Sequence, residues 1–558
     1  MKTDLLLKGK QRRKIWLMLL IIALLPPALL INLGANPLFS VNDEAIRILV
    51  AQEMYLSGDF ITPTTFGDPY LNKPPLFNWL VILSSQALGG FNEFSLRIVS
   101  VLSLLFFGLF VYHYMARHFD RTRAFILSLT LVTSGRILFF DSFLGLIDIM
   151  HGMVIFWNFM LIYHSHTKRR YWTLFLGSYL LTTVAFFLKG MPAIVFQGIT
   201  LITLFTYQHD LRRLFSLKHF VGVLGFLILT GTYYFLYSLN NELSPAELFS
   251  VLLDQSTQRT GISYGFSKTL GHIAAFPFEL IYHFAPWTLL GLVMFRKGSL
   301  KETYRDPFLK YAGLIVLANL TVYWISPGSF ARYLFMMVPL IYLVFSHLYF
   351  SESERAIRSW RVRLIDAIFL IFAAIPSLTL PWLPFTGLLS ETPVSWMLLL
   401  VVWGVFLLIF VFMLRWPHQR FLLAIVSILC IRIVFNLVVL PQRAKADDRY
   451  LLGVRGVVEH TMGYPLFIYK NNYLLQEADA FYINQGRGDL LQRKFDGFTS
   501  QELLLVDDRQ YNSELFEEVY KYACKWYDRP IRVCRMRNSP GDVVPQVTSS
   551  LPPQSSLD

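Results

Sequence analysis

Cysteine is scarce in this chain, with three residues among 558. Three thiols can close at most one internal disulfide, so a small scaffold stapled by several disulfides is excluded. Cys430 falls in an apolar run, where it is best explained as a small core residue. Cys524 and Cys534 both fall near the C-terminus, where an oxidising compartment would permit a disulfide between them.

Internal repeats are also absent from the sequence. No segment recurs at a fixed period, which excludes a repeat array. The two halves lack paired, interrupted helices of inverted topology, a pattern typical of secondary transporters. The N-terminal region has a basic flank and a long apolar run but no small-residue cleavage site, so we expect an uncleaved signal anchor.

Long apolar runs are what the chain has in abundance, with a mean hydropathy of +0.47 and 54% hydrophobic residues. Many runs are about 20 residues long, the length that crosses roughly 30 Å of hydrocarbon. The sequence therefore predicts an all-α polytopic membrane protein with about thirteen spans. They are 15–34, 94–115, 124–140, 142–163, 171–188, 190–207, 219–239, 273–295, 309–325, 333–350, 364–384, 393–414 and 420–440.

The apolar stretch 76–88 is too short to span a membrane. It follows Pro75, a residue favoured in the first turn of a helix, and predicts a juxtamembrane helix in the first external loop. With this assignment the cytoplasmic segments carry 26 Lys and Arg residues and the opposite loops and span ends carry eight. That asymmetry predicts a cytoplasmic N-terminus and an external C-terminal region. The net charge of +13 then belongs to cytoplasmic loops and gives no reason to expect a nucleic-acid partner.

The region after residue 440 differs in kind from the apolar part. Residues 441–537 predict a small soluble α/β domain, and 538–558, rich in Ser and Pro, predict a disordered tail. Apolar spacing predicts helices over 448–460 and 511–526 and strands over 466–470, 480–484, 502–506 and 531–536.

The first external loop carries a group of polar residues suited to chemistry. Asp43 and Glu44 precede an amphipathic helix pattern, where acids also serve as simple helix caps. Lys73 precedes two prolines that keep its backbone extended, and Tyr70 is close by. A snorkelling lysine and an interfacial tyrosine are the structural alternatives for these two residues.

Further ionisable residues recur at span ends on the same side of the membrane. They are Arg136, Asp141, Asp148, Lys189, Arg259, Arg332 and Tyr333. A charge at this depth costs several kcal/mol unless it is paired or faces water. Pairing of Arg136 with Asp141, and of Asp148 with His151, are the structural alternatives. Taken together, the cations and carboxylates predict a site for an anionic headgroup, most simply a phosphate, with a carboxylate left for proton transfer.

Residues 43–80, DEAIRILVAQEMYLSGDFITPTTFGDPYLNKPPLFNWL, resemble the opening loop of the bacterial aminoarabinose transferase and protein O-mannosyltransferase superfamily. These are polytopic GT-C glycosyltransferases that use polyprenyl-phosphate sugars. The similarity extends over about residues 1–440. It continues in RILFFDSFLGL (136–146), LKG (188–190), the Pro286-Trp287 pair and RYLFMMVP (332–339).

The resemblance implies a role for each matching residue. Asp43 matches the family's acid that serves as general base, and Asp141 matches an acid in the second external loop. The residues expected around the donor phosphate are Lys73, Tyr70, Lys189 and Tyr333, with Arg259 a looser match and Arg332 beside it. Glu44, Arg136 and Asp148 are expected to support them.

Two departures concern a metal that the family binds. Aminoarabinose transferases have an acid directly before the lysine of the first motif, and this chain has Asn72 there. His272 does not sit at the family spacing from Pro286-Trp287. The resemblance therefore gives weak grounds for a divalent metal and none for another cofactor.

These observations predict an inverting glycosyltransferase of the bacterial cytoplasmic membrane that works on the periplasmic side. The donor is a polyprenyl-phosphate sugar, and the acceptor is a hydroxyl or phosphate of a lipid such as lipid A, a glycan or a protein. A protein O-glycosyltransferase of the same superfamily is the alternative among enzymes. A flippase for a lipid-linked anion would favour charges at the span centres, and a non-catalytic scaffold would leave the loop acids unexplained. The sequence identifies neither the sugar nor the acceptor.

Overall fold

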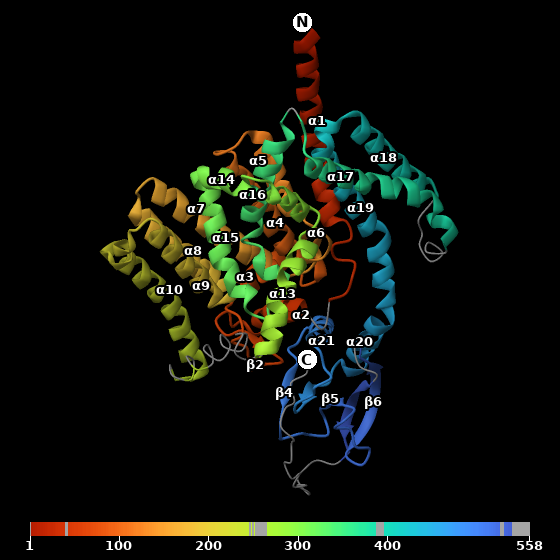
Figure 1. Ribbon diagram of the computed structural model, residues 1–558. Coiled ribbons are helices and arrows are strands. Elements are labelled where there is room, and N and C mark those ends of the chain that lie inside the picture. The colour runs from red at the N-terminus through yellow and green to blue at the C-terminus, as the bar shows by residue number, and fades with distance from the viewer. Residues whose placement is uncertain are drawn as a thin grey trace. The chain divides into compact units, whose positions relative to one another are not determined.

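The computed structural model describes residues 2–38, 43–244, 247, 250, 265–355, 357–386, 396–524 and 529–537 (Figure 1). The chain divides into two compact units. The helical unit comprises Met1–Pro63 and Pro69–Ala446, and the sheet unit comprises Thr64–Asp68 and Asp447–Asp558. The predicted tail 538–558 lies outside the described residues.

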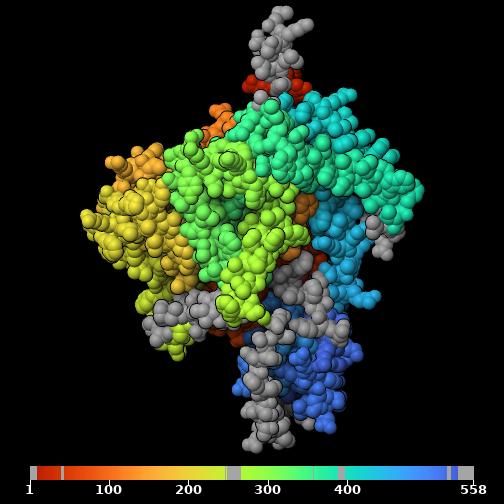
Figure 2. All heavy atoms as spheres, in the orientation of Figure 1, coloured from red at the N-terminus to blue at the C-terminus, as the bar shows by residue number. Residues whose placement is uncertain are grey.

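The helical unit consists of α-helices joined by short 3-10 segments. Several helices that follow one another in the chain pack together, among them α7 with α8, and α1 packs along α19. Figure 2 shows α13 to α16, in green, over the middle of the face of this unit turned to the viewer. Its helices are α1 (Lys2–Leu30), α2 (Asp43–Ser57), α3 (Leu76–Ala87), α4 (Glu93–Met115), α5 (Arg121–Val132), α6 (Gly135–Phe139), η1 (Asp141–Phe143), α7 (Asp148–Thr167), α8 (Tyr171–Lys189), α9 (Pro192–Tyr207), η2 (Leu211–Phe215), α10 (Leu217–Asn241), α13 (Phe266–His283), η3 (Trp287–Phe295), α14 (Ser299–Arg305), α15 (Pro307–Trp324), η4 (Ala331–Leu334), α16 (Val338–Ser353), α17 (Trp360–Thr379), η5 (Leu380–Thr386), α18 (Trp396–Arg415), η6 (Pro417–Gln419) and α19 (Arg420–Ala446).

By length and composition, seven helices of the described chain can cross a membrane, or eight if one bent pair counts as a single span. The polytopic helical class is confirmed, and the number of thirteen spans is not. The short helix α3 has 12 residues, as expected for the stretch after Pro75. The seven helices lie within Gln11–Leu30, Glu93–Met115, Tyr171–Lys189, Leu217–Asn241, Trp360–Thr386, Trp396–Arg415 and Pro417–Ala446.

The predicted span 124–140 is wrong as one continuous helix, because it breaks between α5 and α6 with a bend of 53°. The backbone N–H of Gly135 donates to the carbonyl of Ala285 at 2.7 Å instead of continuing the helix ladder. A Cβ at Gly135 would lie 2.7 Å from that same oxygen, so the contact requires glycine. The indole of Trp287 donates to Thr133 at 3.1 Å and holds the break in place.

Two further predicted spans also differ from the structure. The span 273–295 divides into α13 and η3, because Pro286 lacks the N–H that a continuing helix needs. The span 142–163 begins late, since α7 starts only at Asp148. In both cases the backbone is irregular where other chain segments make hydrogen bonds with it.

The sheet unit contains a five-stranded mixed sheet in the order β4-β3-β5-β7-β6. Strand β3 is parallel to β4 and β5, whereas β7 is antiparallel to β5 and β6. Its elements are the short strands β1 (Thr64–Thr65) and β2 (Asp68–Pro69, which extends one residue beyond the unit), then α20 (Asp448–Thr461), β3 (Leu466–Tyr469), α21 (Glu477–Arg487), β4 (Gln492–Lys494), β5 (Leu503–Asp507), β6 (Phe516–Ala523) and β7 (Pro530–Met536).

Helix 448–460 and the strands 466–470, 502–506 and 531–536 are confirmed. The predicted strand 480–484 is wrong, because it lies in α21, which starts with a capping box at Gln476. The predicted helix over 511–526 is also wrong, because it contains β6. A register shift between Glu518 and Tyr520 interrupts the alternation of β6, so its apolar spacing resembled that of a helix.

The disulfide between Cys524 and Cys534, which the sequence left open, is absent from the structure. Both thiols are free and buried in the sheet unit. The Cys524 thiol lies 3.5 Å from the carbonyl of Leu474. Burial raises the pKa of Cys534 to about 12, so this thiol stays protonated and unreactive at neutral pH.

Candidate active site

Four charged side chains from four different elements form a continuous chain of ion pairs in the helical unit. Nη2 of Arg332, in η4, donates to Oδ2 of Asp43, the first residue of α2, at 2.7 Å. Nε of Arg332 lies 3.5 Å from Oδ2 of Asp148, the first residue of α7. Lys189, the last residue of α8, donates its Nζ–H to Oδ1 of Asp148. Acids at helix starts and a cation at a helix end are the positions that the helix dipole favours.

Exposure separates the members of this ion-pair chain. The side chains of Asp148, Lys189 and Arg332 are 7%, 9% and 11% exposed. The side chain of Asp43 is 41% exposed. A molecule arriving from solvent can therefore contact the carboxylate of Asp43, while Asp148 is occupied by its two cations.

Aromatic rings lie against the two cations. Nζ of Lys189 is 3.7 Å from the ring centroid of Tyr333. Cζ of Arg332 lies 5.8 Å from the same ring and 4.9 Å from that of Phe330. The rings limit solvation of the cations and attract them through their π faces, which holds both charges in place.

Asp141 and Arg136 form a second ion pair, as considered from the sequence. Nε of Arg136 lies 3.0 Å from Oδ2 of Asp141. Asp141 is fully buried in η1, and the charge of Arg332 acts on it. Asp148 pairs with Lys189 and Arg332, so the alternative pairing with His151 is not what the structure has.

Tyr70 and Lys73 lie on the loop between α2 and α3. Tyr70 contacts Arg47, a residue that the sequence analysis did not single out. Nη2 of Arg47 donates to the hydroxyl of Tyr70 at 2.9 Å, and its Cζ lies 5.6 Å from the Tyr70 ring. Arg47 is 1% exposed, and its Nε and Nη1 have no hydrogen-bond acceptor among the described residues. Lys73 is half-buried in that loop. The spacing of Arg47 four residues after Asp43, on one helix face, was the available signal.

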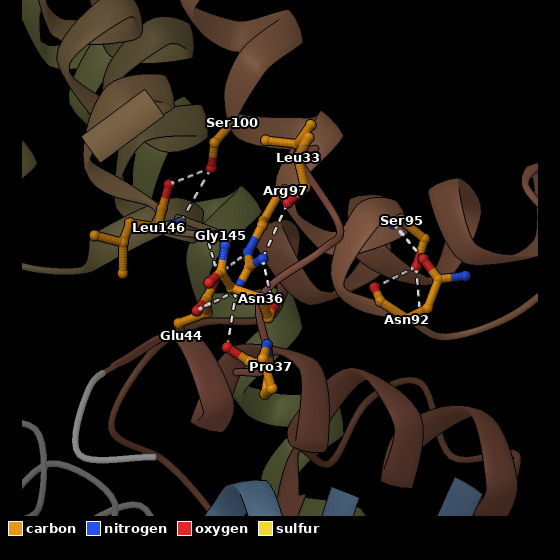
Figure 3. A network of polar contacts seen from close by, with 10 residues as sticks. All are labelled: Leu33, Asn36, Pro37, Glu44, Asn92, Ser95, Arg97, Ser100, Gly145 and Leu146. Atoms are coloured by element: carbon orange, nitrogen blue, oxygen red, sulfur yellow. Dashed lines mark hydrogen bonds and ion pairs between the residues drawn. The ribbon is translucent and has the colours of Figure 1, made fainter. Parts of the chain in front are cut away.

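Glu44, predicted as a supporting residue, is fully buried and paired with Arg97 of α4 (Figure 3). Nε and Nη2 of Arg97 donate to its two oxygens at 2.8 and 3.2 Å. The backbone N–H of Gly145 donates to Oε1 at 2.8 Å. Arg97 also donates to the carbonyls of Leu33 at 3.0 Å, Asn36 at 2.8 Å and Pro37 at 3.3 Å.

This network fixes the start of α2, and therefore Asp43, against three other segments. Ser100 extends the same contact by exchanging hydrogen bonds with Leu146 at 3.0 and 3.1 Å. Glu44 thus acts on the site by holding its neighbour. The sequence analysis did not single out Arg97, because its partner Glu44 lies 53 residues away, too far along the chain for local spacing to predict the pair.

Three further residues were named from the sequence, one for the donor phosphate and two in connection with a metal. Arg259 lies outside the described residues. Asn72 is exposed in the loop before α3. Nε2 of His272 lies 3.2 Å from the carbonyl of Tyr323 and 3.4 Å from the hydroxyl of Ser329. Within the described ranges, no three His, Cys, Asp or Glu residues gather as a metal site would require.

Sequence comparison gives partial matches to known glycosyltransferases. A family model described as dolichyl-phosphate-mannose-protein mannosyltransferase matches residues 72–235. An undecaprenyl phosphate-alpha-4-amino-4-deoxy-L-arabinose arabinosyl transferase of Shewanella sediminis is 32% identical over 128 residues, 23% of this chain and 22% of the relative. An uncharacterized protein of Aquifex aeolicus is 26% identical over 206 residues, 37% of this chain and 40% of the relative. The chain thus spans less than half the length of these relatives.

Comparison of folds extends over nearly the whole chain. The crystal structure of ArnT from Cupriavidus metallidurans bound to undecaprenyl phosphate superposes with a TM-score of 0.64 at 19% sequence identity. The match covers 94% of this chain and 98% of that one. The chain therefore has the fold of that protein, and it resembles the GT-C glycosyltransferases of the aminoarabinose transferase type.

Proposed function

We propose that this protein transfers a sugar from a polyprenyl-phosphate donor to an acceptor hydroxyl or phosphate at the periplasmic face of the bacterial cytoplasmic membrane. The observation that carries the proposal is the ion-pair chain in which the exposed carboxylate of Asp43 is joined through Arg332 to the buried Asp148–Lys189 pair. A solvent-accessible carboxylate can accept the proton of the acceptor, and the neighbouring cations can stabilise the phosphate that leaves the sugar.

The cations form the side of the site that binds the donor phosphate. Lys189 and Arg332 pair with the carboxylates of Asp43 and Asp148. Lys73, and Arg47 on α2, would add two further positive charges for the donor phosphate. Nε and Nη1 of Arg47 have no acceptor in the described chain, which favours an anion as their partner. Tyr70 and Tyr333 orient two of these cations through their rings. Arg259 is proposed from the charge pattern of the sequence and from the resemblance.

These cations act on the transition state. As the bond between the sugar and the phosphate oxygen breaks, negative charge grows on the departing polyprenyl phosphate. Lys189 and Arg332 are already fixed by Asp148 and by the Tyr333 ring, so little reorganisation is needed to stabilise that charge. Stabilisation of developing charge lowers the barrier more than it strengthens ground-state binding.

Asp43 accepts the proton of the acceptor, because its carboxylate is exposed while Asp141 and Asp148 are buried. Attack from the face opposite the leaving phosphate gives inversion at the anomeric carbon. In the resting site Arg332 holds Asp43 at 2.7 Å. A bound donor phosphate competes for Arg332 and releases the carboxylate, so the base becomes effective when the donor is in place.

A second candidate concerns the acceptor. The family model that matches residues 72–235 is described by protein mannosylation, which favours a protein acceptor. The partial matches to arabinosyl transferases favour a lipid acceptor. Mass spectrometry of lipid A, surface glycans and secreted proteins from cells with and without the gene distinguishes the two.

The test of the proposal is release of polyprenyl phosphate from labelled polyprenyl-phosphate sugars by the full chain in nanodiscs. We expect release that depends on an added membrane extract as acceptor source, and a product of inverted anomeric configuration by NMR. Lys73→Ala should slow release about tenfold or more, while Lys301→Ala, on α14 away from the site, should not. Absence of release with every donor tested would contradict the proposal.

A further inference from the structure

The first external loop contains a short hairpin that belongs to the sheet unit. Strands β1 and β2 pair across a two-residue turn of Phe66 and Gly67, with φ values of +55° and +80°. Positive φ at both central residues is typical of a type I′ turn, in which Asn or Gly is usual. Phenylalanine is a costly residue at this position, so its ring is expected to make compensating contacts.

Those contacts are made with strand β4 of the same unit. The backbone N–H of Arg493 donates to the carbonyl of Phe66 at 3.1 Å. Its Nη1 donates to Oδ2 of Asp68 at 2.5 Å, and its Cζ lies 4.8 Å from the Phe66 ring. A Cβ at Gly67 would lie 2.9 Å from the side chain of Gln492, so the turn packs closely on β4.

The position of β4 explains why the hairpin can be held there. It is the terminal strand in the order of the sheet, paired with β3 on one side. Its other edge would expose unpaired backbone groups. The hairpin occupies part of that edge through the Phe66 carbonyl, and Arg493 adds an ion pair and a ring contact to the same short segment.

The hairpin lies in the chain immediately before two residues of the proposed phosphate site. Tyr70 is two residues and Lys73 five residues after Asp68. An extended chain advances at most about 3.6 Å per residue, so the Cα of Lys73 lies within about 18 Å of that of Asp68. Pro69 stiffens the connection, and the N–H of Tyr70 donates to the carbonyl of Pro63 at 2.7 Å to close the hairpin base.

We propose that Arg493 is a positioning residue for the donor site: by holding Phe66 and Asp68 it fixes the loop that presents Tyr70 and Lys73 to the donor phosphate. This inference rests on the proposed function. It gives the sheet unit a role in donor binding through a covalent connection. The Asp68–Arg493 pair is partly exposed, at 46% and 27%, and such pairs add little to folding stability. Its loss is therefore expected to affect the donor more than the fold.

The test uses the full chain in nanodiscs with Arg493→Gln, Asp68→Asn and the double variant. We measure KM for the lipid-linked sugar and Kd for undecaprenyl phosphate. Each single variant should raise both about tenfold, and the double variant should be no worse than either single. Phe66→Gly, which suits the φ of the turn but removes the ring, should raise both in the same direction. Arg532→Gln is the matched control, because Arg532 pairs with Asp508 and Glu518 within the same sheet.

The outcomes separate this inference from the proposed function. Unchanged KM and Kd, a lower kcat with unchanged KM, or additive effects in the double variant overturn it, since a fold defect reduces the active fraction without changing KM. An equal rise in Arg532→Gln overturns it as well. If the wild type neither binds undecaprenyl phosphate nor transfers sugar, the proposed function fails and this inference fails with it.

Discussion

Nη2 of Arg332 lies 2.7 Å from Oδ2 of Asp43, while Nε of the same guanidinium lies 3.5 Å from Oδ2 of Asp148. One cation thus connects the exposed acid of the site with its buried acid. The two carboxylates come from separate helices. Because Arg332 contacts both, it holds the carboxylate of Asp43 in place and partly neutralises its charge. We expect the donor phosphate to change that balance.

Replacement of Arg332 tests this shared role. Arg332→Gln should lower the single-turnover transfer rate about 100-fold, because it removes a cation placed where charge develops on the leaving phosphate. The rate is measured with saturating labelled donor. Arg361→Gln is the control, since Arg361 is half-buried and its guanidinium donates to the carbonyl of Phe295 in a solvent-exposed hydrogen bond. A loss of less than about fivefold for Arg332→Gln would show that Arg332 does not act on the transition state.

The buried pair of Asp148 and Lys189 allows stability and activity to be separated. Asp148→Asn leaves Lys189 without its closest counter-charge and should destabilise the protein by about 3–5 kcal/mol. Adding Lys189→Met should recover most of that stability but no transfer activity. Thermal unfolding in detergent and transfer in nanodiscs are the two measurements. If the double variant regained activity with its stability, the pair would be structural only.

Arg47 and Tyr70 should contribute to donor binding as a unit. Tyr70→Phe removes the acceptor of Nη2 of Arg47, and Arg47→Lys removes the planar group that stacks near the ring. We expect each variant to raise the donor KM about fivefold, and the double variant to be no worse than the stronger single. Steady-state kinetics with varied donor give these values. A rise in the acceptor KM alone would place Arg47 on the other side of the site.

Substitution of the two neighbouring acids at the start of α2, Asp43 and Glu44, should affect the stability of the protein differently. Glu44→Gln weakens the buried fork with Arg97 and leaves that guanidinium without its counter-charge, so we expect a loss of about 3–5 kcal/mol of stability. Asp43→Asn should leave the unfolding temperature nearly unchanged, because Asp43 is 41% exposed. Thermal unfolding in detergent, monitored by size-exclusion chromatography, measures the stability of both variants. Equal destabilisation by the two changes would contradict the separate roles.

The grouping of four charged residues was predicted from the sequence better than the course of the backbone. Asp43 was named from the polar first external loop, and Asp148, Lys189 and Arg332 were named as ionisable residues at apolar span ends. The structure brings these four side chains together. A charged residue at the edge of an apolar run can be recognised from the sequence alone, without knowledge of the fold. Burial is not a local signal, so the opposite environments of Asp43 and Glu44 could not be predicted.

The errors in the backbone have a common origin in contacts between distant segments. The break before Gly135 depends on the carbonyl of Ala285, which hydropathy along the chain cannot register. The strand β6 was predicted as a helix because the shift at Glu518 and Tyr520 disturbs its alternation. The hairpin at Phe66 could not be predicted, because phenylalanine is unusual at a turn position with positive φ. The strand that binds the hairpin, β4, lies more than 400 residues further along the chain.

The base role of Asp43 is the central claim, and transfer by Asp43→Asn tests it most directly. With labelled polyprenyl-phosphate sugar in nanodiscs, the variant should transfer at least about 100-fold more slowly than the wild type while binding undecaprenyl phosphate at least as tightly. Asp59→Asn is the control and should transfer normally, because Asp59 lies in the loop after α2 and accepts hydrogen bonds from the backbone N–H groups of Ile61 and Thr62. An Asp43→Asn protein that keeps more than about a tenth of the wild-type rate would contradict the account.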